Sequence, residues 1–208
     1  MTTTSAAAPA SETLPTVKHD YLPILLPIAL AALALPFVGN PTTWVTLTVA
    51  ALAMGMMIFV IASGLTLVFG LMDVLNFGHG AFIAVGAYLA LSVLVLLSGW
   101  VQADSLAWNL MALGLAVTVA MIGTGALGWA FERIIVKPVY GQHLKQILIT
   151  MGGLIVAEQL IHVIWGGDQK AMALPTALRG AVVFGDFAIE KFRILAVVVG
   201  LVVFCAMM

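Results

Sequence analysis

The stretch GLMDVLNFGHGAF, Gly70 to Phe82, interrupts an otherwise apolar run from Trp44 to Leu97 with an Asp, an Asn, a His and three glycines. Two membrane-spanning helices of about 20 residues use most of that run and leave roughly 14 residues for a break. At membrane depth, such a break is tolerated only where protein buries it or where it lines a water-filled cavity. The stretch therefore predicts either a capped turn at the membrane surface or a discontinuous helix beside a polar route.

The two interpretations assign different roles to the same side chains. In the first, Gly70 ends one helix, Asn76 caps the next, and His79 lies among lipid headgroups. In the second, the broken helix ends present free backbone N–H and C=O groups to a polar solute. We expect the second, with the break over residues 70–80, because apolar spans have no need of a long polar turn.

The composition of the whole chain indicates the solvent in which it folds. Of its 208 residues, 63% are hydrophobic and 8% are charged, and the mean hydropathy is +1.17. Globular proteins average about 45–50% apolar and about 25% charged residues. The chain is therefore predicted to be an all-α polytopic membrane protein. Its net charge of -1 gives no indication of nucleic acid, and its single cysteine, Cys205, excludes an intramolecular disulfide.

Apolar segments along the chain predict about six transmembrane helices. They cover about residues 21–38, 44–69, 81–97, 107–131, 147–165 and 192–208. Residues 1–20 are rich in Ser, Thr, Ala and Pro and predict a flexible tail. The sixth segment is still apolar at Met208, so we expect residues 21–208 to form a transmembrane domain that is incomplete at its C-terminus.

The charged connections predict the orientation in the membrane. The connection over residues 132–146 holds Arg133, Lys137 and Lys145 against a single acid, Glu132. Short basic loops stay in the cytoplasm. We therefore expect the N-terminal tail on the cytoplasmic side and the connection over residues 166–191 on the opposite side.

A second polar site is predicted on the fifth segment, where Glu158 and His162 are four residues apart and share a helix face. An ionisable group at that depth costs about 2.5–3.5 kcal/mol on insertion scales, so it should face protein and have a partner. The pair either pins two helices together or lines a polar pathway. One His and one acid do not make the two-His zinc motif, so we expect no metal site.

Two longer pieces of the sequence carry a family resemblance. They are GLTLVFGLMDVLNFGHGAFIAVGAYLAL, Gly64 to Leu91, and ERIIVKPVYGQHLKQILITMGGLIVAEQL, Glu132 to Leu160. Together they resemble the membrane permease subunit of bacterial ABC importers for branched-chain amino acids, a family whose relatives carry urea or short amides. The N-F-x-H-G segment of that family falls on Asn76, Phe77, Gly78, His79 and Gly80, and its E-R-x-x-x-x-P segment falls on Glu132, Arg133 and Pro138.

The resemblance implies a set of partners and a role without catalysis. It implies a second homologous permease, two cytoplasmic ATPase subunits, a periplasmic solute-binding protein, and a place in the bacterial inner membrane. It implies no cofactor and no catalytic residue, because the partner subunits hydrolyse ATP. The expected pathway residues are Asn76, Phe77, Gly78, His79, Gly80, Glu158 and His162.

The resemblance also suggests how a zwitterionic amino acid could be accommodated. Asn76 and His79 would meet its carboxylate or ammonium and would be turned toward the second permease. Phe77, Phe82 and Met72 would meet its apolar side chain. The sequence does not identify which solute is carried.

The sequence departs from the family in two respects, and two other functions are compatible with it. The tail and the proline-rich first segment resemble the partner permease more closely, and the sequence stops before the cytoplasmic loop that docks on the ATPase in such permeases. One alternative is a secondary transporter or channel that moves protons or ions through Glu158, His162 and His79. Another is a purely structural membrane subunit. Copurification of an ATPase with a P-loop would distinguish the importer permease from both alternatives.

Overall fold

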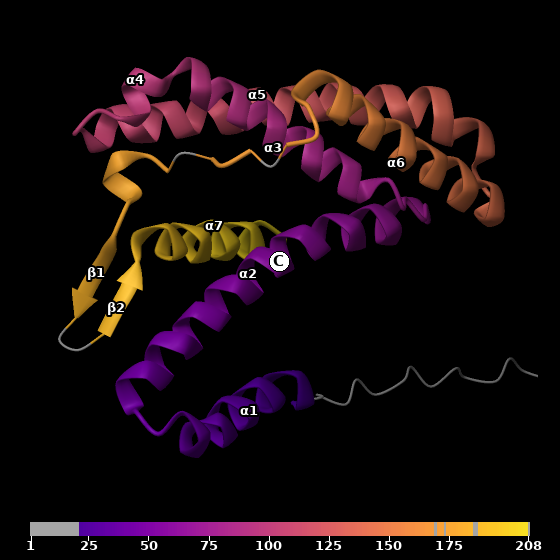
Figure 1. The fold of residues 1–208 in the computed structure, drawn as a ribbon. Coiled ribbons are helices and arrows are strands. Elements are labelled where there is room, and N and C mark those ends of the chain that lie inside the picture. The colour runs from indigo at the N-terminus through magenta and orange to yellow at the C-terminus, as the bar shows by residue number, and fades with distance from the viewer. Residues whose placement is uncertain (1–20, 169, 173, 185–186, 208) are drawn as a thin grey trace, which may run out of the picture. The chain divides into compact units, whose positions relative to one another are not determined.

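The computed structural model describes residues 21–168, 170–172, 174–184 and 187–207, and over these residues the chain is almost entirely helical (Figure 1). The predicted tail, residues 1–20, lies outside the described residues. The chain divides into two compact units, Met1–Trp44 and Val45–Met208.

The first unit is organised by the joint between two helices. Helix α1 spans Leu22–Val38 and ends at Gly39, whose φ of 69° is left-handed and therefore suits glycine. Helix α2 spans Pro41–Met72, so it begins in this unit and continues in the second. Asn40 caps its start, because the Asn40 side-chain oxygen accepts a hydrogen bond from the Thr42 N–H at 2.9 Å.

The second unit contains the remaining elements. They are α3 (His79–Leu96), α4 (Ser98–Val101), α5 (Leu106–Phe131), a π-helical turn η1 (Glu132–Val136), a 3-10 turn η2 (Lys137–Val139), α6 (His143–Trp165), a 3-10 turn η3 (Thr176–Leu178), β1 (Ala181–Phe184), β2 (Phe187–Glu190) and α7 (Lys191–Met207). Among the described residues, four helical stretches are long and apolar enough to cross a membrane, namely 41–72, 79–96, 106–139 and 143–165. The prediction of an all-α polytopic membrane protein is therefore confirmed.

The predicted break in the apolar run is confirmed, but it is narrower than expected. Helix α2 continues through Gly70 to Met72, and the irregular backbone covers only Asp73–Gly78, which we call the break segment. Gly70 is therefore not the residue that ends the helix. Asp73 ends it instead, because its φ of 52° is left-handed and its N–H closes the last turn on the Phe69 carbonyl at 2.9 Å.

Small residues bring α3 and α5 into close contact. A Cβ added to Gly86 of α3 would lie 3.2 Å from the methyl group of Thr124, and one added to Gly123 of α5 would lie 2.7 Å from Leu89. Glycine at these points lets the helix backbones approach, as expected for helices that pack inside a membrane. The buried core beside this crossing consists of Leu94, Val101, Ala112 and Ala116.

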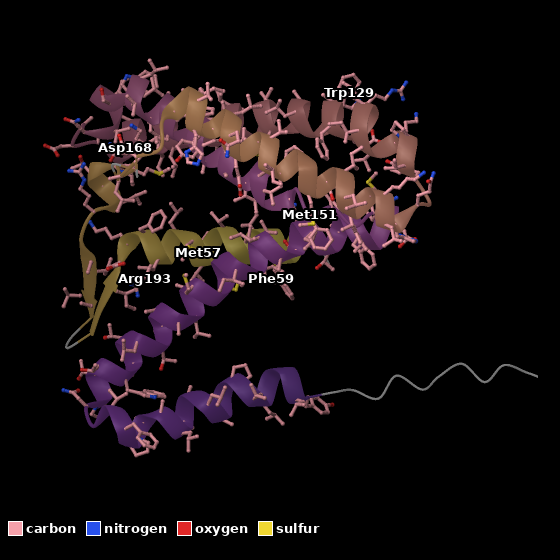
Figure 2. All side chains as sticks on the ribbon, turned by 45° about the vertical axis from the view of Figure 1, so that its right-hand side comes forward. Met57, Phe59, Trp129, Met151, Asp168 and Arg193 are labelled. Carbon is pink, nitrogen blue, oxygen red and sulfur yellow. The ribbon has the colours of Figure 1, made fainter. Side chains whose placement is uncertain are left out.

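Most large apolar side chains remain uncovered within the chain. Trp129, on the outer side of α5 in Figure 2, is 69% exposed, and Val163 of α6 is 81% exposed. Helices that are apolar on all sides are typical of membrane spans. The exposed apolar surface therefore agrees with lipid or protein neighbours rather than with water.

The connection between α6 and α7 adds a feature that the helical prediction omitted. Strands β1 and β2 pair antiparallel, with Ala181 opposite Glu190. Their sequences, AVVF and FAIE, are rich in β-branched and aromatic residues and flank a Gly-Asp pair, which is a hairpin signal.

The same connection is tied to the helices at a corner formed by α4, the start of α5 and η3, which we call the Asn109 corner. Asn109 is 1% exposed. Its amide nitrogen donates to the carbonyls of Trp100 at 2.8 Å and Ala103 at 2.9 Å, and its amide oxygen accepts from the Ala177 N–H at 2.8 Å. One buried side chain thus satisfies three backbone groups.

Candidate functional site

The break segment runs along α6 into the bundle. It starts at Asp73, whose carboxylate lies 4.0 Å from the imidazole of His143, the first residue of α6, and both side chains are exposed. Leu75 and Phe77 contact Thr150, seven residues farther along α6, which corresponds to about 10 Å of helix. The segment therefore passes from the exposed end of α6, beside the basic loop, to a buried position.

Asn76 shapes the turn at the end of the break segment. Its side-chain oxygen accepts a hydrogen bond from the Gly78 N–H at 3.0 Å, and its carbonyl oxygen accepts one from the His79 N–H at 3.3 Å. Gly78 occupies the N-cap position of α3. The interpretation in which Asn76 caps the helix is thus wrong in position, because the Asn76 side chain closes a turn that precedes the cap.

His79 links α3 to α2. Its Nε2 atom lies 3.2 Å from the Ile61 carbonyl oxygen, and since a carbonyl only accepts, the ring must donate from Nε2. Gly64, one turn along α2, leaves room for the ring, because a Cβ there would lie 3.1 Å from His79 Cε1. The imidazole is therefore held between the two helices that the break segment connects.

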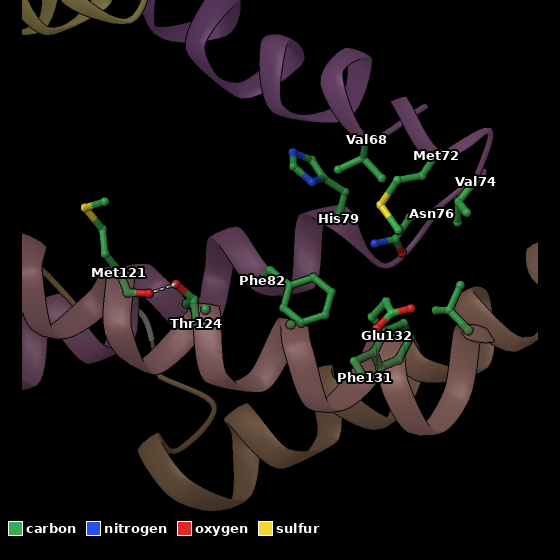
Figure 3. Close-up of a pocket in the computed structure, with 13 residues that line it drawn as sticks. Val68, Met72, Val74, Asn76, His79, Phe82, Met121, Thr124, Phe131 and Glu132 are labelled. Carbon is green, nitrogen blue, oxygen red and sulfur yellow. Dashed lines mark hydrogen bonds between the residues drawn. The ribbon is translucent and has the colours of Figure 1, made fainter. Parts of the chain in front are cut away.

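Two grooves meet at the break segment. The first has a volume of about 450 Å³, and its lining includes Met72, Phe82, Phe131, Thr124 and Glu132. The second has a volume of about 510 Å³, and its lining includes Leu65, Phe69, Phe77, Gly80 and Ile83. Val74, Asn76 and His79 line both. In Figure 3 the His79 ring points away from the Phe82 ring and toward α2, and the Asn76 side chain lies in this view between Met72 and Glu132.

The chemistry of the two grooves suits a small amphipathic solute. Their walls are mostly aliphatic and aromatic, and the polar groups are few: an amide, an imidazole, hydroxyls and one carboxylate. Ligand sites commonly combine such apolar walls with a small number of placed polar groups. Asn76 of the break segment supplies the amide and His79, the first residue of α3, supplies the imidazole to both grooves.

The end of α5 contributes the carboxylate of the first groove. Glu132 begins the π-helical turn η1, and π-helical turns frequently occur at functional sites. Its carboxylate accepts a hydrogen bond from the Tyr140 hydroxyl in the basic loop. This hydrogen bond, loss of hydration and the carboxylate charge raise the pKa of Tyr140 above its ordinary value.

Phe131 is a contact residue that the sequence reasoning missed. Its ring packs edge-on against Phe82 at a centroid distance of 5.4 Å. A Cβ added to Gly153 of α6 would lie 2.5 Å from the ring, and one added to Gly78 would lie 3.9 Å from it. Phe131 thus fills the space between α3, α6 and the break segment, and no local pattern in the sequence identifies that role.

Thr150 was also missed. It is 0% exposed, and its hydroxyl lies 3.2 Å from the Phe77 N–H nitrogen and 3.4 Å from the Leu75 carbonyl oxygen. A threonine within the apolar sequence ITMGG was the signal available, but it is a weak one, since a helical threonine commonly bonds its own backbone.

Glu158 and His162 lie elsewhere on α6. Both are exposed, whereas Gln146, Thr150 and Ile161 form the buried stripe of the helix. Among the described residues, no hydrogen bond or ion pair joins Glu158 to His162, and none joins either residue to His79. The expected Glu–His pair is therefore not formed, and a continuous proton relay through these three residues has no support within the chain.

The sequence comparisons identify relatives of the chain. A family profile described as "Branched-chain amino acid transport system / permease component" matches residues 47–208. The chain is 33% identical over 135 residues to the high-affinity branched-chain amino acid transport system permease protein BraD of Pseudomonas aeruginosa, which covers 65% of this chain and 42% of that protein. It is 29% identical over 126 residues to LivH of Salmonella typhimurium, which bears the same description, covering 61% of this chain and 39% of LivH.

A further match is LivH of Escherichia coli K12, 28% identical over 125 residues, which covers 60% of this chain and 39% of that protein. The chain thus spans about two fifths of the length of the curated relatives it matches. No solved structure matches it. Since the family profile covers most of the chain, the protein belongs to the permease-component family of branched-chain amino acid transport systems.

Proposed function

We propose that this chain is a permease subunit of an ATP-driven importer and forms half of a translocation pathway for branched-chain amino acids or similar small solutes. The relatives named above are permease proteins of high-affinity branched-chain amino acid transport systems. The observation that supports the pathway is the break segment, because Asn76 and His79 line two apolar grooves at once.

Transport requires a route that replaces the solute's water without holding the solute tightly. The Asn76 amide and the His79 imidazole can exchange hydrogen bonds with a carboxylate or an ammonium group. Phe77 and Phe82, one in each groove, offer apolar surface to an aliphatic side chain. Of the expected pathway glycines, Gly78 lets the backbone lie close to α6, whereas Gly80 belongs to α3 and lines the second groove.

The proposed assembly contains a second homologous permease, two cytoplasmic ATPase subunits and a periplasmic solute-binding protein, in the bacterial inner membrane. The second permease would cover the exposed face of α6 that carries Glu158 and His162, because an uncovered carboxylate in lipid is costly. We assign no cofactor and no catalytic residue to this chain. ATP hydrolysis would occur in the partner subunits.

The pathway is tested by uptake of labelled leucine into vesicles that contain the assembled transporter. Asn76→Ala and His79→Ala should each lower uptake about three- to tenfold, as expected for the loss of one hydrogen bond to the solute. ATPase activity and association of the binding protein should persist. Thr118→Ala, at an exposed site on α5, is the control. Wild-type uptake in both alanine variants would contradict the proposed route.

The proposed orientation places the N-terminus and residues 132–146 in the cytoplasm and residues 166–191 in the periplasm. Arg133, Lys137 and Lys145 are all exposed, which is compatible with a basic loop in water. Lys137→Cys and Lys170→Cys, each in a Cys205→Ala background, should react with an impermeant thiol reagent from opposite sides. Reaction of both from outside the cell would refute this orientation.

A further inference from the structure

The hydroxyl of Thr150, on α6, is a hydrogen-bond partner for a backbone N–H of the break segment. Its shortest contact is to the Gln146 carbonyl of its own helix, at 2.8 Å, so its single proton is donated there. Its lone pairs are then free to accept the Phe77 N–H at 3.2 Å. Thr150 itself is fully buried.

The backbone of Thr150 contacts the same segment. A Cβ added to Gly78 would lie 3.3 Å from the Thr150 carbonyl oxygen, so glycine lets the segment lie this close to α6 without crowding it. Phe77 and Gly78 directly follow Asn76 and precede His79. Fixing these two residues therefore fixes the backbone positions from which the amide and the imidazole enter the grooves.

We propose that Thr150 is a positioning residue of the transport route: its hydroxyl holds the break segment against α6 and so sets the places of Asn76 and His79. Thr150 does not line either groove and would not touch the solute. This inference rests on the proposed function for its effect on transport, whereas the hydrogen bond itself can be tested without transport.

The transport test compares Thr150→Ser with Thr150→Ala, which differ from each other only by the hydroxyl. In the assembled transporter, Thr150→Ala should raise the apparent KM for leucine about fivefold, with the amount of complex unchanged, because the missing acceptor releases the segment. Thr150→Ser should restore the wild-type KM. Thr118→Ala is the matched control, because the Thr118 hydroxyl donates to the Gly114 carbonyl of its own helix. Equal KM values for the Ser and Ala variants would overturn the inference.

Hydrogen exchange of the same complex supplies the independent readout. The amide of Phe77 should exchange about tenfold faster in Thr150→Ala than in the wild type or in Thr150→Ser. Unchanged exchange would also overturn the inference. If the wild-type complex does not import leucine or a related solute, the proposed function fails, while the exchange result still decides whether Thr150 holds the segment.

Discussion

The Asn109 corner and the break segment both contain backbone groups that need a hydrogen-bond partner inside the protein, but the partners differ. In each, a buried polar side chain on a long helix forms hydrogen bonds with backbone groups of a connection between helices. The hydrogen bonds of Asn109 are 2.8–2.9 Å long and use all of its donors and its acceptor oxygen. Thr150 makes one hydrogen bond to the break segment, in which it accepts from the Phe77 N–H at 3.2 Å, and among the described residues the nearby buried Gln146 oxygen Oε1 has no partner.

The surroundings of the two regions differ as well. The Asn109 corner lies beside the buried core that contains Val101 and Ala112, whereas the break segment lies between two grooves. Fully satisfied polar networks rigidify a structure, while weaker and fewer bonds leave a segment free to adjust. The comparison indicates that the Asn109 corner is a rigid frame and that the break segment is more adaptable; in the proposed transport route, the break segment would contact the solute.

The largest effect should come from the rigid region. Asn109→Leu would leave two carbonyls and one N–H without their partner and should lower the free energy of unfolding by about 3 kcal/mol or more. Asn109→Asp should fall between, because it keeps the acceptor for Ala177 and loses both donors. Thermal unfolding in detergent is the measurement, with Gln102→Leu at an exposed site as control. If Asn109→Leu unfolds at the same temperature as the wild type, the Asn109 corner is not the more rigid of the two regions.

A smaller loss of stability is expected where Phe131 packs beside the break segment. Gly153→Val should cost about 2 kcal/mol by overpacking, because even its Cβ would lie 2.5 Å from the Phe131 ring. Gly152→Val is the matched control, since nothing lies within 4 Å of a Cβ there. Phe131→Leu should recover part of the loss in a double variant, as measured by thermal unfolding. Equal losses for the two glycine variants would show that the close contact is not responsible.

The next change should affect transport more than stability. Gly64→Ala would place a methyl group 3.1 Å from the His79 ring and push the imidazole from the Ile61 carbonyl, so uptake should fall about threefold, or about 0.7 kcal/mol. Gly55→Ala, in the same helix, is the control, because nothing lies within 4 Å of a Cβ added there. It should leave uptake unchanged. If both variants transport equally well, the position of the His79 ring is not a determinant of the route.

The smallest effect is expected at Tyr140, which is 41% exposed. Tyr140→Phe should change thermal stability only slightly below pH 10. The pKa of Tyr140 is raised in the folded state, so folding favours the neutral phenol. The contribution of Tyr140 to folding stability is therefore present below its ordinary pKa of 10.0, and it is lost as the pH rises through the higher pKa of the folded state. The absorbance difference between wild type and variant should titrate above pH 10. A midpoint below pH 10 would contradict the bond to Glu132.

The sequence by itself determined the solvent and the class of fold. Long apolar runs with 8% charged residues can satisfy their backbone in lipid only as helices. The cluster of Gly, Asn and His around residues 70–80 interrupts these apolar runs, and the helix break lies within it. These features are local in the chain, so they could be predicted without knowledge of packing.

Only the tertiary structure decided how the break is held and which polar residues meet. Phe77 and Thr150 are 73 residues apart in the sequence, and no helical period relates them. The spacing of Glu158 and His162 put them on one face of α6, but only the packing of α3 and the break segment against the other face left them exposed. Periodicity defines which residues share a face, whereas contacts between distant segments define which face is covered.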